Sequence, residues 1–79
     1  MPTHLRSTMS EHRRDKRGVV VAFDDHVGLG TIESDGTSYL FHCVEIADGT
    51  RTIAVGTSVE FIAVTRFGTL EASDVAARA

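Results

Sequence analysis

Short apolar segments recur along the chain from Gly18 onward, each bounded by polar turn residues. They occupy residues 19–23, 27–33, 38–44, 58–64 and 69–75. Their lengths, and their content of Val, Ile, Thr, Tyr and Phe, are typical of β-strands. Turns that contain Asp, Gly or both separate the segments at residues 24–26, 34–37 and 67–68, and a longer loop covers residues 47–56. Five short strands with regular turns predict a small all-β barrel rather than a sandwich.

The alternation within these segments sorts the side chains onto two faces, because neighbouring residues of a strand point in opposite directions. One phase is expected to fill the barrel with Val20, Ile32, Tyr39, Phe41, Val59, Phe61 and Val75. Leu29, Thr31, Leu40 and His42 have the opposite phase on two adjacent segments. We therefore expect these four residues to form an outward patch, and any function of the sheet to lie there.

The first 17 residues differ in composition from the rest of the chain. They are polar, lack apolar periodicity, and carry five Lys or Arg against two Asp or Glu, whereas residues 18–79 carry three against nine. We expect a flexible basic arm over residues 1–17, one domain over residues 18–75 and a short tail over residues 76–79. Met9 is an alternative start within the arm. Neutralisation of phosphates supplies most non-specific affinity for nucleic acids, and the acidic domain is poorly equipped to provide it.

Size and composition exclude several classes of protein. A chain of 79 residues holds one domain at most. The longest apolar run, residues 19–23, is far shorter than the roughly 20 residues of a membrane-spanning helix. The N-terminus lacks the apolar core of a signal peptide, so we expect a cytoplasmic protein of bacterial type. A single cysteine, Cys43, excludes an internal disulfide framework.

Two neighbouring motifs resemble the paired strand motifs of the cold-shock domain family. The chain reads VGLGTI at residues 27–32 and YLFHC at residues 39–43, where the family reads KGFGFI and VFVHF. The matching positions are Gly28, Gly30, Ile32 and His42. The positions of the family's stacking aromatics hold Leu29, Thr31, Leu40 and Cys43 instead.

The resemblance extends over residues 18–75. GVVVAFD at residues 18–24 is similar to the family's opening GxVKWFN, with Val21 at the lysine and Ala22 at the tryptophan. GTSVEF at residues 56–61 and ASDV at residues 72–75 are similar to the later patterns GxxVxF and AxNV. The resemblance implies an OB-type barrel of five antiparallel strands. The matches are mostly turns and inward residues, whereas the departures concentrate on the binding face.

The function that the resemblance implies is binding of single-stranded RNA or DNA, with a regulatory or chaperone-like use. Stacking on an aromatic ring is worth ~1–3 kcal/mol per base, so a face without four or five of its rings should bind weakly and with little sequence preference. The residues expected to bind are Phe23, Leu29, Thr31, Leu40 and His42 on the sheet, with Arg51 and Arg66 near its rim.

A protein-interaction or homodimerisation module is the alternative. Val19, Val21, Leu29 and Leu40 would form an exposed apolar patch with few charges, as at many protein contacts. In this case the barrel is kept and the stacking platform is lost.

Catalysis, a metal site and a cofactor are not expected. Asp24, Asp25 and His26 are consecutive in a tight turn and cannot all converge on one ion. His42 and Cys43 are adjacent strand residues that should point to opposite faces, and no group to orient a nucleophile is visible.

Overall fold

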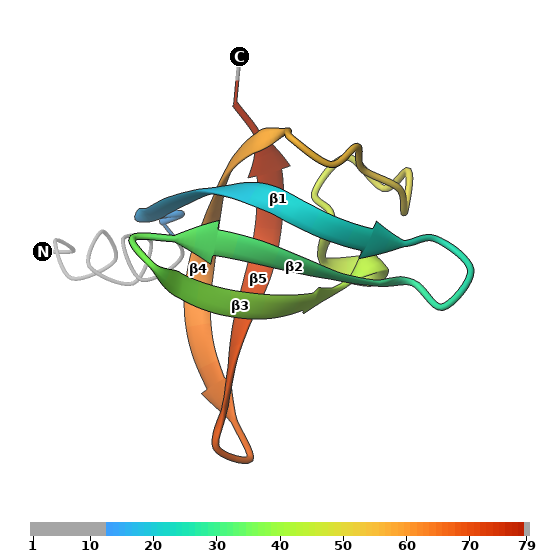
Figure 1. Cartoon of the computed structure of the whole chain (residues 1–79). Coiled ribbons are helices and arrows are strands. Elements are labelled where there is room, and N and C mark those ends of the chain that lie inside the picture. The colour runs from blue at the N-terminus through green and yellow to red at the C-terminus, as the bar shows by residue number, and fades with distance from the viewer. Residues whose placement is uncertain (1–12, 79) are drawn as a thin grey trace, which may run out of the picture.

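The computed structural model describes residues 13–78, in which five strands form a closed barrel (Figure 1). The elements are β1 (Lys16–Asp24), β2 (Leu29–Ser34), β3 (Thr37–His42), the 3-10 helix η1 (Cys43–Glu45), β4 (Ser58–Arg66) and β5 (Thr69–Ala77). The strand order around the barrel is β1-β2-β3-β5-β4. Four junctions are antiparallel and one, between β3 and β5, is parallel. The expected five-stranded all-β barrel is confirmed, and no helix among residues 13–78 could cross a membrane.

The strand ends differ from the sequence prediction by a few residues. β1 begins at Lys16, so the last two residues of the expected arm pair with β4, where Lys16 lies opposite Phe61. Val27 belongs to a turn instead of β2, because Asp24 Oδ1 accepts hydrogen bonds from the backbone N–H groups of His26 and Val27. β5 runs on to Ala77, two residues into the expected tail. Residues 1–12 lie outside the described part, so the flexibility expected for the arm stays a prediction there.

The barrel interior contains all seven side chains that the alternation assigned to it. Ile46 and Ala72 join them in one buried cluster. The rings of Tyr39 and Phe61 meet edge to face, with centroids 5.0 Å apart. Full burial of each large apolar side chain contributes roughly 1.5–3 kcal/mol to the stability of the fold. The two-residue period of the sequence therefore determines which face of each strand is buried.

A β-bulge in β1 changes the face on which its residues lie. Val20 pairs with Ile32 and Ala22 pairs with Thr31, so Val21 is an extra residue without its own partner in β2. A bulge of this kind bends the strand and shifts the alternation by one residue. As a result Val21 and Ala22 are both exposed, although they are neighbours.

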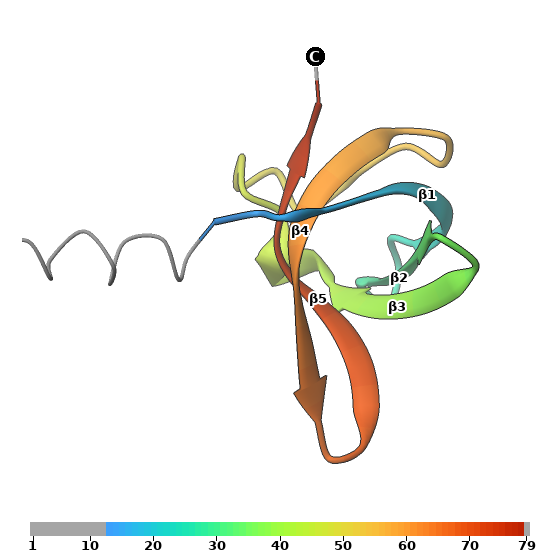
Figure 2. The ribbon, with the colours of Figure 1, turned by 90° about the vertical axis from the view of Figure 1, so that its left-hand side faces the viewer.

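The barrel closes along a narrow parallel seam between β3 and β5. Among the described residues, Leu40 opposite Glu71 is the registered pair of this junction, and a bridge between Ile46 and Val75 follows it. The Ala47 N–H donates to the Val75 carbonyl oxygen at 2.7 Å. Below the seam, the β4–β5 hairpin projects past β3, as both views of the ribbon show (Figure 1, Figure 2).

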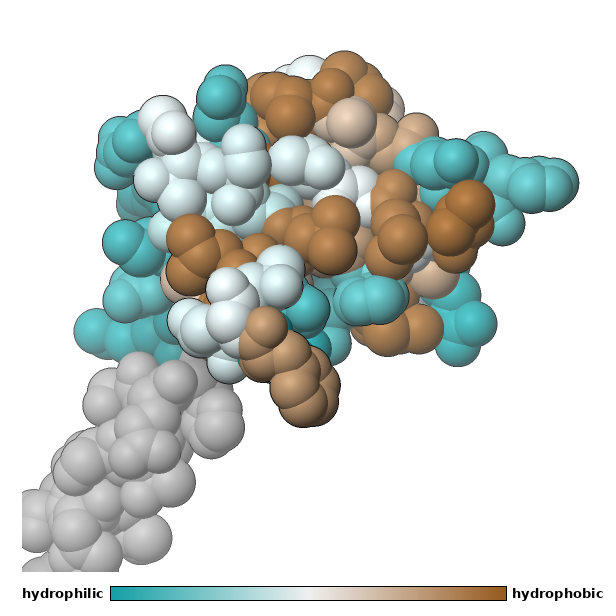
Figure 3. Space-filling model, turned by 60° about the horizontal axis from the view of Figure 1, so that its bottom comes forward, coloured by the Kyte–Doolittle hydropathy of each residue, from teal (hydrophilic) through white to brown (hydrophobic). Residues whose placement is uncertain are grey.

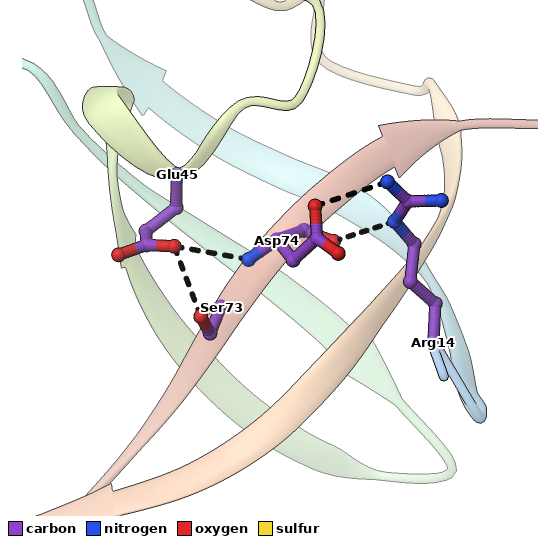
Figure 4. A network of polar contacts seen from close by, with 4 residues as sticks. All are labelled: Arg14, Glu45, Ser73 and Asp74. Atoms are coloured by element: carbon purple, nitrogen blue, oxygen red, sulfur yellow. Dashed lines mark hydrogen bonds and ion pairs between the residues drawn. The ribbon is translucent and has the colours of Figure 1, made fainter. Parts of the chain in front are cut away.

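A polar network holds a bulge in β5 and ties the N-terminal side of β1 to it (Figure 4). Asp74 has a left-handed backbone, with φ 52°, where the register between β4 and β5 shifts. Glu45 Oε1 accepts hydrogen bonds from the Asp74 N–H and the Ser73 hydroxyl, both at 3.0 Å. Arg14 donates to the Asp74 carboxylate at 3.0 Å and to its carbonyl oxygen at 3.1 Å. Residue 14, expected in the flexible arm, is thus bound to the barrel.

Candidate functional site

Two cross-strand rows bring together the outward patch that the sequence predicts. Leu29 of β2 lies opposite His42 of β3, and Thr31 lies opposite Leu40. Ala22 of β1 extends the second row, since it pairs with Thr31. Residues directly opposite on one face of a sheet are close enough for their side chains to touch. We call these five residues the candidate face.

An open hollow of about 220 Å³ lies on the candidate face. Its lining comes from Ala22, Phe23, Asp24, Leu29, Gly30, Thr31 and Leu40. Pockets for drug-sized ligands measure about 300–1,000 Å³ and enclose most of their ligand, so this hollow is better suited to one flat group that stays partly exposed. The surface seen from the lower side of the barrel carries apolar areas across its middle and polar residues toward its edges (Figure 3).

Phe23, the one aromatic residue expected at the site, is shared between the hollow and the core. Its ring stacks on the buried ring of Phe41, with centroids 5.8 Å apart and an angle of 13° between the planes. Gly30 makes room for both rings, because a Cβ there would lie 2.5 Å from Phe41 and 2.8 Å from Phe23. Phe23 is therefore half-buried, and only part of its ring is available to a ligand.

Cys43 takes no part in the candidate face. It packs against the buried cluster, and its N–H donates to the Gly28 carbonyl oxygen at 2.8 Å. Gly28 has φ 82°, and a Cβ at this residue would lie 2.8 Å from Cys43 Sγ. The turn after β1 and the start of η1 are thus in close contact beside the candidate face. His42, by contrast, is exposed on the candidate face.

The two arginines expected at the rim differ in their surroundings. Arg66 Nη1 donates to Glu71 Oε1 at 3.0 Å, and Glu71 lies opposite Leu40 at the edge of the candidate face. The charge of Arg66 is therefore offset by this carboxylate. Arg51 is exposed in the loop between η1 and β4, with a left-handed φ of 63°. The structure thus places Arg51 on a loop and not on the sheet.

The loop that carries Arg51 is shaped by an ionised carboxylate. Asp48 Oδ1 accepts hydrogen bonds from the Thr50 N–H at 3.0 Å and from the Thr50 hydroxyl at 2.8 Å. These bonds favour the charged form and hold the pKa of Asp48 below its ordinary value of 3.8. The Thr50 hydroxyl also lies 3.1 Å from the Thr52 carbonyl oxygen, so one side chain links both sides of Arg51.

Metal chemistry has no ready ligand set in residues 13–78, where no three His, Cys, Asp or Glu side chains are grouped to hold an ion. Asp24, considered above as part of such a set, caps the turn after β1 with its carboxylate. The presence of Asp24 in the sequence is therefore explained by the turn that its carboxylate stabilises.

Sequence reasoning missed Phe67, a fully exposed aromatic residue at the tip of the β4–β5 hairpin. The available signal was the pair Phe67-Gly68 itself, because a Phe is unusual where a turn requires a left-handed backbone. Leu70, three residues further along the chain, is also exposed.

Among solved structures, the chain is similar to one named "drosophila Unr CSD456", with a TM-score of 0.73 and 20% sequence identity. The barrel has a cold-shock-domain fold. The match covers 92% of this chain and 30% of that one, so this chain spans less than a third of its length. No protein-family model matches the sequence, and no curated protein matches it significantly.

Within the cold-shock fold, this chain matches the resembled motifs at positions that the architecture requires and differs from them on the surface of the candidate face. The glycines at Gly28 and Gly30 are required by close contacts with Cys43, Phe23 and Phe41. Apart from His42, the candidate face instead presents Leu29, Thr31 and Leu40 on the two strands where the resemblance implies aromatic rings.

Proposed function

We propose that this chain binds single-stranded RNA or DNA weakly, and with little sequence preference, through the candidate face. The supporting observation is the pair of outward rows, Leu29 with His42 and Thr31 with Leu40, on a barrel with the cold-shock fold. The aliphatic side chains offer apolar contact to a base but no ring, and each lost ring removes ~1–3 kcal/mol of stacking. The exposed His42 ring and part of Phe23 supply what stacking remains on the sheet.

The charge of the domain adds to this weakness. Residues 18–79 carry three Arg against nine Asp or Glu, so the domain repels phosphates on balance. Arg51 on its loop and the basic residues at the N-terminal side of β1 are the groups proposed to offset that repulsion. Arg66 contributes less than we expected from the sequence, because it already pairs with Glu71. A regulatory or chaperone-like role in the cytoplasm suits weak binding of this kind.

Fluorescence anisotropy with labelled oligo-U and oligo-dT at low salt tests the proposal. At physiological salt we expect dissociation constants in the range of non-specific binding, about 10⁻⁴–10⁻⁶ M, and lower values at low salt. Leu40→Glu should abolish binding, whereas Ala77→Glu, an equal change of charge at the exposed end of β5, should reduce it only slightly. Failure of the wild-type chain to bind either strand at low salt would overturn the proposal.

A protein contact through Val19, Val21, Leu29 and Leu40 is the second candidate. The observation in its favour is the β1 bulge, beside which Val19 and Val21 remain 41% and 44% exposed. A second copy of the chain is the simplest partner for such a surface. Light scattering across a concentration series measures self-association directly, and Val21→Lys should reverse it if the face is the contact.

A further inference from the structure

The chain builds the same two-residue hairpin turn twice, with different residues. Between β2 and β3 the turn consists of Asp35 and Gly36, with φ values of 51° and 77°. Between β4 and β5 it consists of Phe67 and Gly68, with φ values of 51° and 79°. Positive φ at both positions is the type I′ geometry, which favours Asn or Asp followed by Gly. Asp35 meets this requirement and Phe67 does not.

Phe67 is unfavourable for the isolated fold in two respects. A bulky side chain with a left-handed backbone is an outlier, because its Cβ crowds the neighbouring carbonyl oxygen. The ring is also fully exposed, so it contributes no burial in return. Since Asp35 shows what the same turn accommodates without this conflict, Phe67 is not explained by the stability of the chain. A strained and exposed residue of this kind points to a contact outside the molecule.

The position of the hairpin connects Phe67 with the candidate face. Leu40 of the face lies opposite Glu71, which belongs to the strand that continues from the turn. Gly68 and two strand residues separate Glu71 from Phe67, so the two lie at most roughly 13 Å apart at about 3.3 Å per residue. Leu70, 42% exposed, lies between them in the sequence but on the opposite face of β5 from Glu71, because neighbouring strand residues alternate. The surface that leaves the face over the seam thus passes the Arg66–Glu71 ion pair and ends in an aromatic ring.

The tip of the β4–β5 hairpin adds no net negative charge that would repel a nucleic-acid strand. Residues 65–70 contain one charged side chain, Arg66, and it pairs with Glu71. No uncompensated carboxylate therefore comes from the hairpin tip itself, in a domain that is otherwise acidic. An aromatic ring stacks on any base, because every base presents a π-face.

We infer that Phe67 is an additional base-stacking site for a single strand that crosses the candidate face and reaches the tip of the β4–β5 hairpin. This inference rests on the proposed function and extends the binding site beyond the sheet. It supplies, from the hairpin, the kind of contact that Leu29 and Thr31 cannot make. Sites on OB-type folds span about 4–16 nucleotides, so a site extended in this way remains within their range.

The test compares strands of two lengths. Oligo-U of about 4 nucleotides can occupy the face alone, whereas about 12 nucleotides can also reach Phe67. Phe67→Asn, which suits the turn, should weaken binding of the longer strand at least fivefold and change binding of the shorter strand less than twofold. Phe67→Tyr keeps a ring and should bind the longer strand like the wild type.

Photo-crosslinking gives a second, direct measurement. A 12-nucleotide strand with 5-iodouridine near one end should crosslink to Phe67. Trypsin cleaves after Arg66 and Arg78, so the modified peptide is residues 67–78. Mass spectrometry of this peptide assigns the modified residue, and a crosslink confined to the candidate face would contradict the inference.

The outcomes separate the inference from the proposed function. If the longer strand binds the wild type and Phe67→Asn equally, the ring is not a binding site, while the proposed function stands. If both lengths weaken equally, the substitution acts through the fold, and the inference is again overturned. If the wild type binds neither strand, both fail. If Phe67→Asn changes the molar mass measured by light scattering but not the binding of the longer strand, the ring is a contact between copies of the chain, and the inference is overturned.

Discussion

Glu71 lies directly opposite Leu40 where β3 meets β5, so a carboxylate borders the candidate face. The Arg66 guanidinium lies 3.0 Å from this carboxylate and neutralises it. A basic residue that the sequence offers to phosphates is therefore largely occupied within the protein. This ion pair determines how much of the charge of the β4–β5 hairpin remains available to a ligand.

Glu71→Gln should strengthen binding to single strands. The substitution removes a negative charge at the face and frees Arg66 for a phosphate. One additional neutralised phosphate should steepen the slope of log K against log salt by about 0.7. Asp35→Asn changes the net charge equally at the other hairpin and should leave the slope nearly unchanged. Equal slopes for both variants would show that Arg66 contacts no phosphate.

Restoring rings on the candidate face should restore affinity. The triple variant Ala22→Trp, Leu29→Phe, Thr31→Phe places rings in two adjacent rows, and each stacked base contributes ~1–3 kcal/mol. We expect at least tenfold tighter binding of oligo-dT in an anisotropy titration, which corresponds to about 1.4 kcal/mol. Ala77→Trp adds a ring away from the face and should not have this effect. Unchanged affinity in a folded triple variant would contradict the nucleic-acid proposal.

The two hairpin turns predict opposite effects of reciprocal substitutions on stability. Phe67→Asn relieves a left-handed backbone that costs a bulky residue about 1–2 kcal/mol. Each kcal/mol shifts Tm by about 4–8 °C in a domain of this size, so calorimetry should show a clear rise. Asp35→Phe introduces the same conflict into the β2–β3 turn and should lower Tm by a similar amount. A fall in Tm for Phe67→Asn would mean that the ring stabilises the chain.

The network at Asp74 should depend more on Glu45 than on Arg14. Glu45 is partly buried and accepts two hydrogen bonds across the bulge, so Glu45→Ala should cost about 1.5–3 kcal/mol. The Arg14–Asp74 pair is about one-third exposed, with side chains 36% and 39% accessible, and such a pair is worth less than about 1 kcal/mol. Urea denaturation of Glu45→Ala and Arg14→Ala measures both values, and the reverse order would contradict this ranking.

Asp48 predicts a pH dependence of its loop at strongly acidic pH. The hydrogen bonds from Thr50 lower its pKa in the folded chain, so the stabilisation of the loop is complete above the unfolded value of 3.8. It is lost as the pH falls through the lowered, folded pKa. The Thr50 amide resonance should therefore titrate with a midpoint below 3.8. Asp48→Asn should remove this titration, and a midpoint above 3.8 would contradict the hydrogen-bond assignment.

The sequence predicts those parts of the structure that depend on side-chain periodicity. Val20, Ile32 and Phe41 are buried where the alternation places them, because an apolar face must be covered. The sequence did not predict that β1 begins at Lys16, because this extension depends on contacts of the backbone and not on the pattern of side chains. The Ser34 hydroxyl donates to the Arg17 carbonyl oxygen at 2.6 Å, a contact that any residue at position 17 could accept.

The candidate site was predictable to the same extent. The pairing of Leu29 with His42 and of Thr31 with Leu40 follows from strand phase and a short hairpin. The β1 bulge was not predictable, because one extra residue leaves no mark in an apolar run. The partners of Arg14 and Arg66 were not predictable either, since Asp74 lies 60 residues from Arg14 and the Arg66–Glu71 pair forms across a turn.

The seam between β3 and β5 also has a consequence for dynamics. A junction with little backbone pairing opens locally at a lower free energy than the rest of a barrel. Amide hydrogens beside Leu40 and Glu71 should therefore exchange with deuterium faster than those between β1 and β2. A strand bound from the candidate face to the β4–β5 hairpin would span this seam and slow the exchange there. Binding would then stabilise the closed barrel at this junction, where the chain itself supplies little backbone pairing.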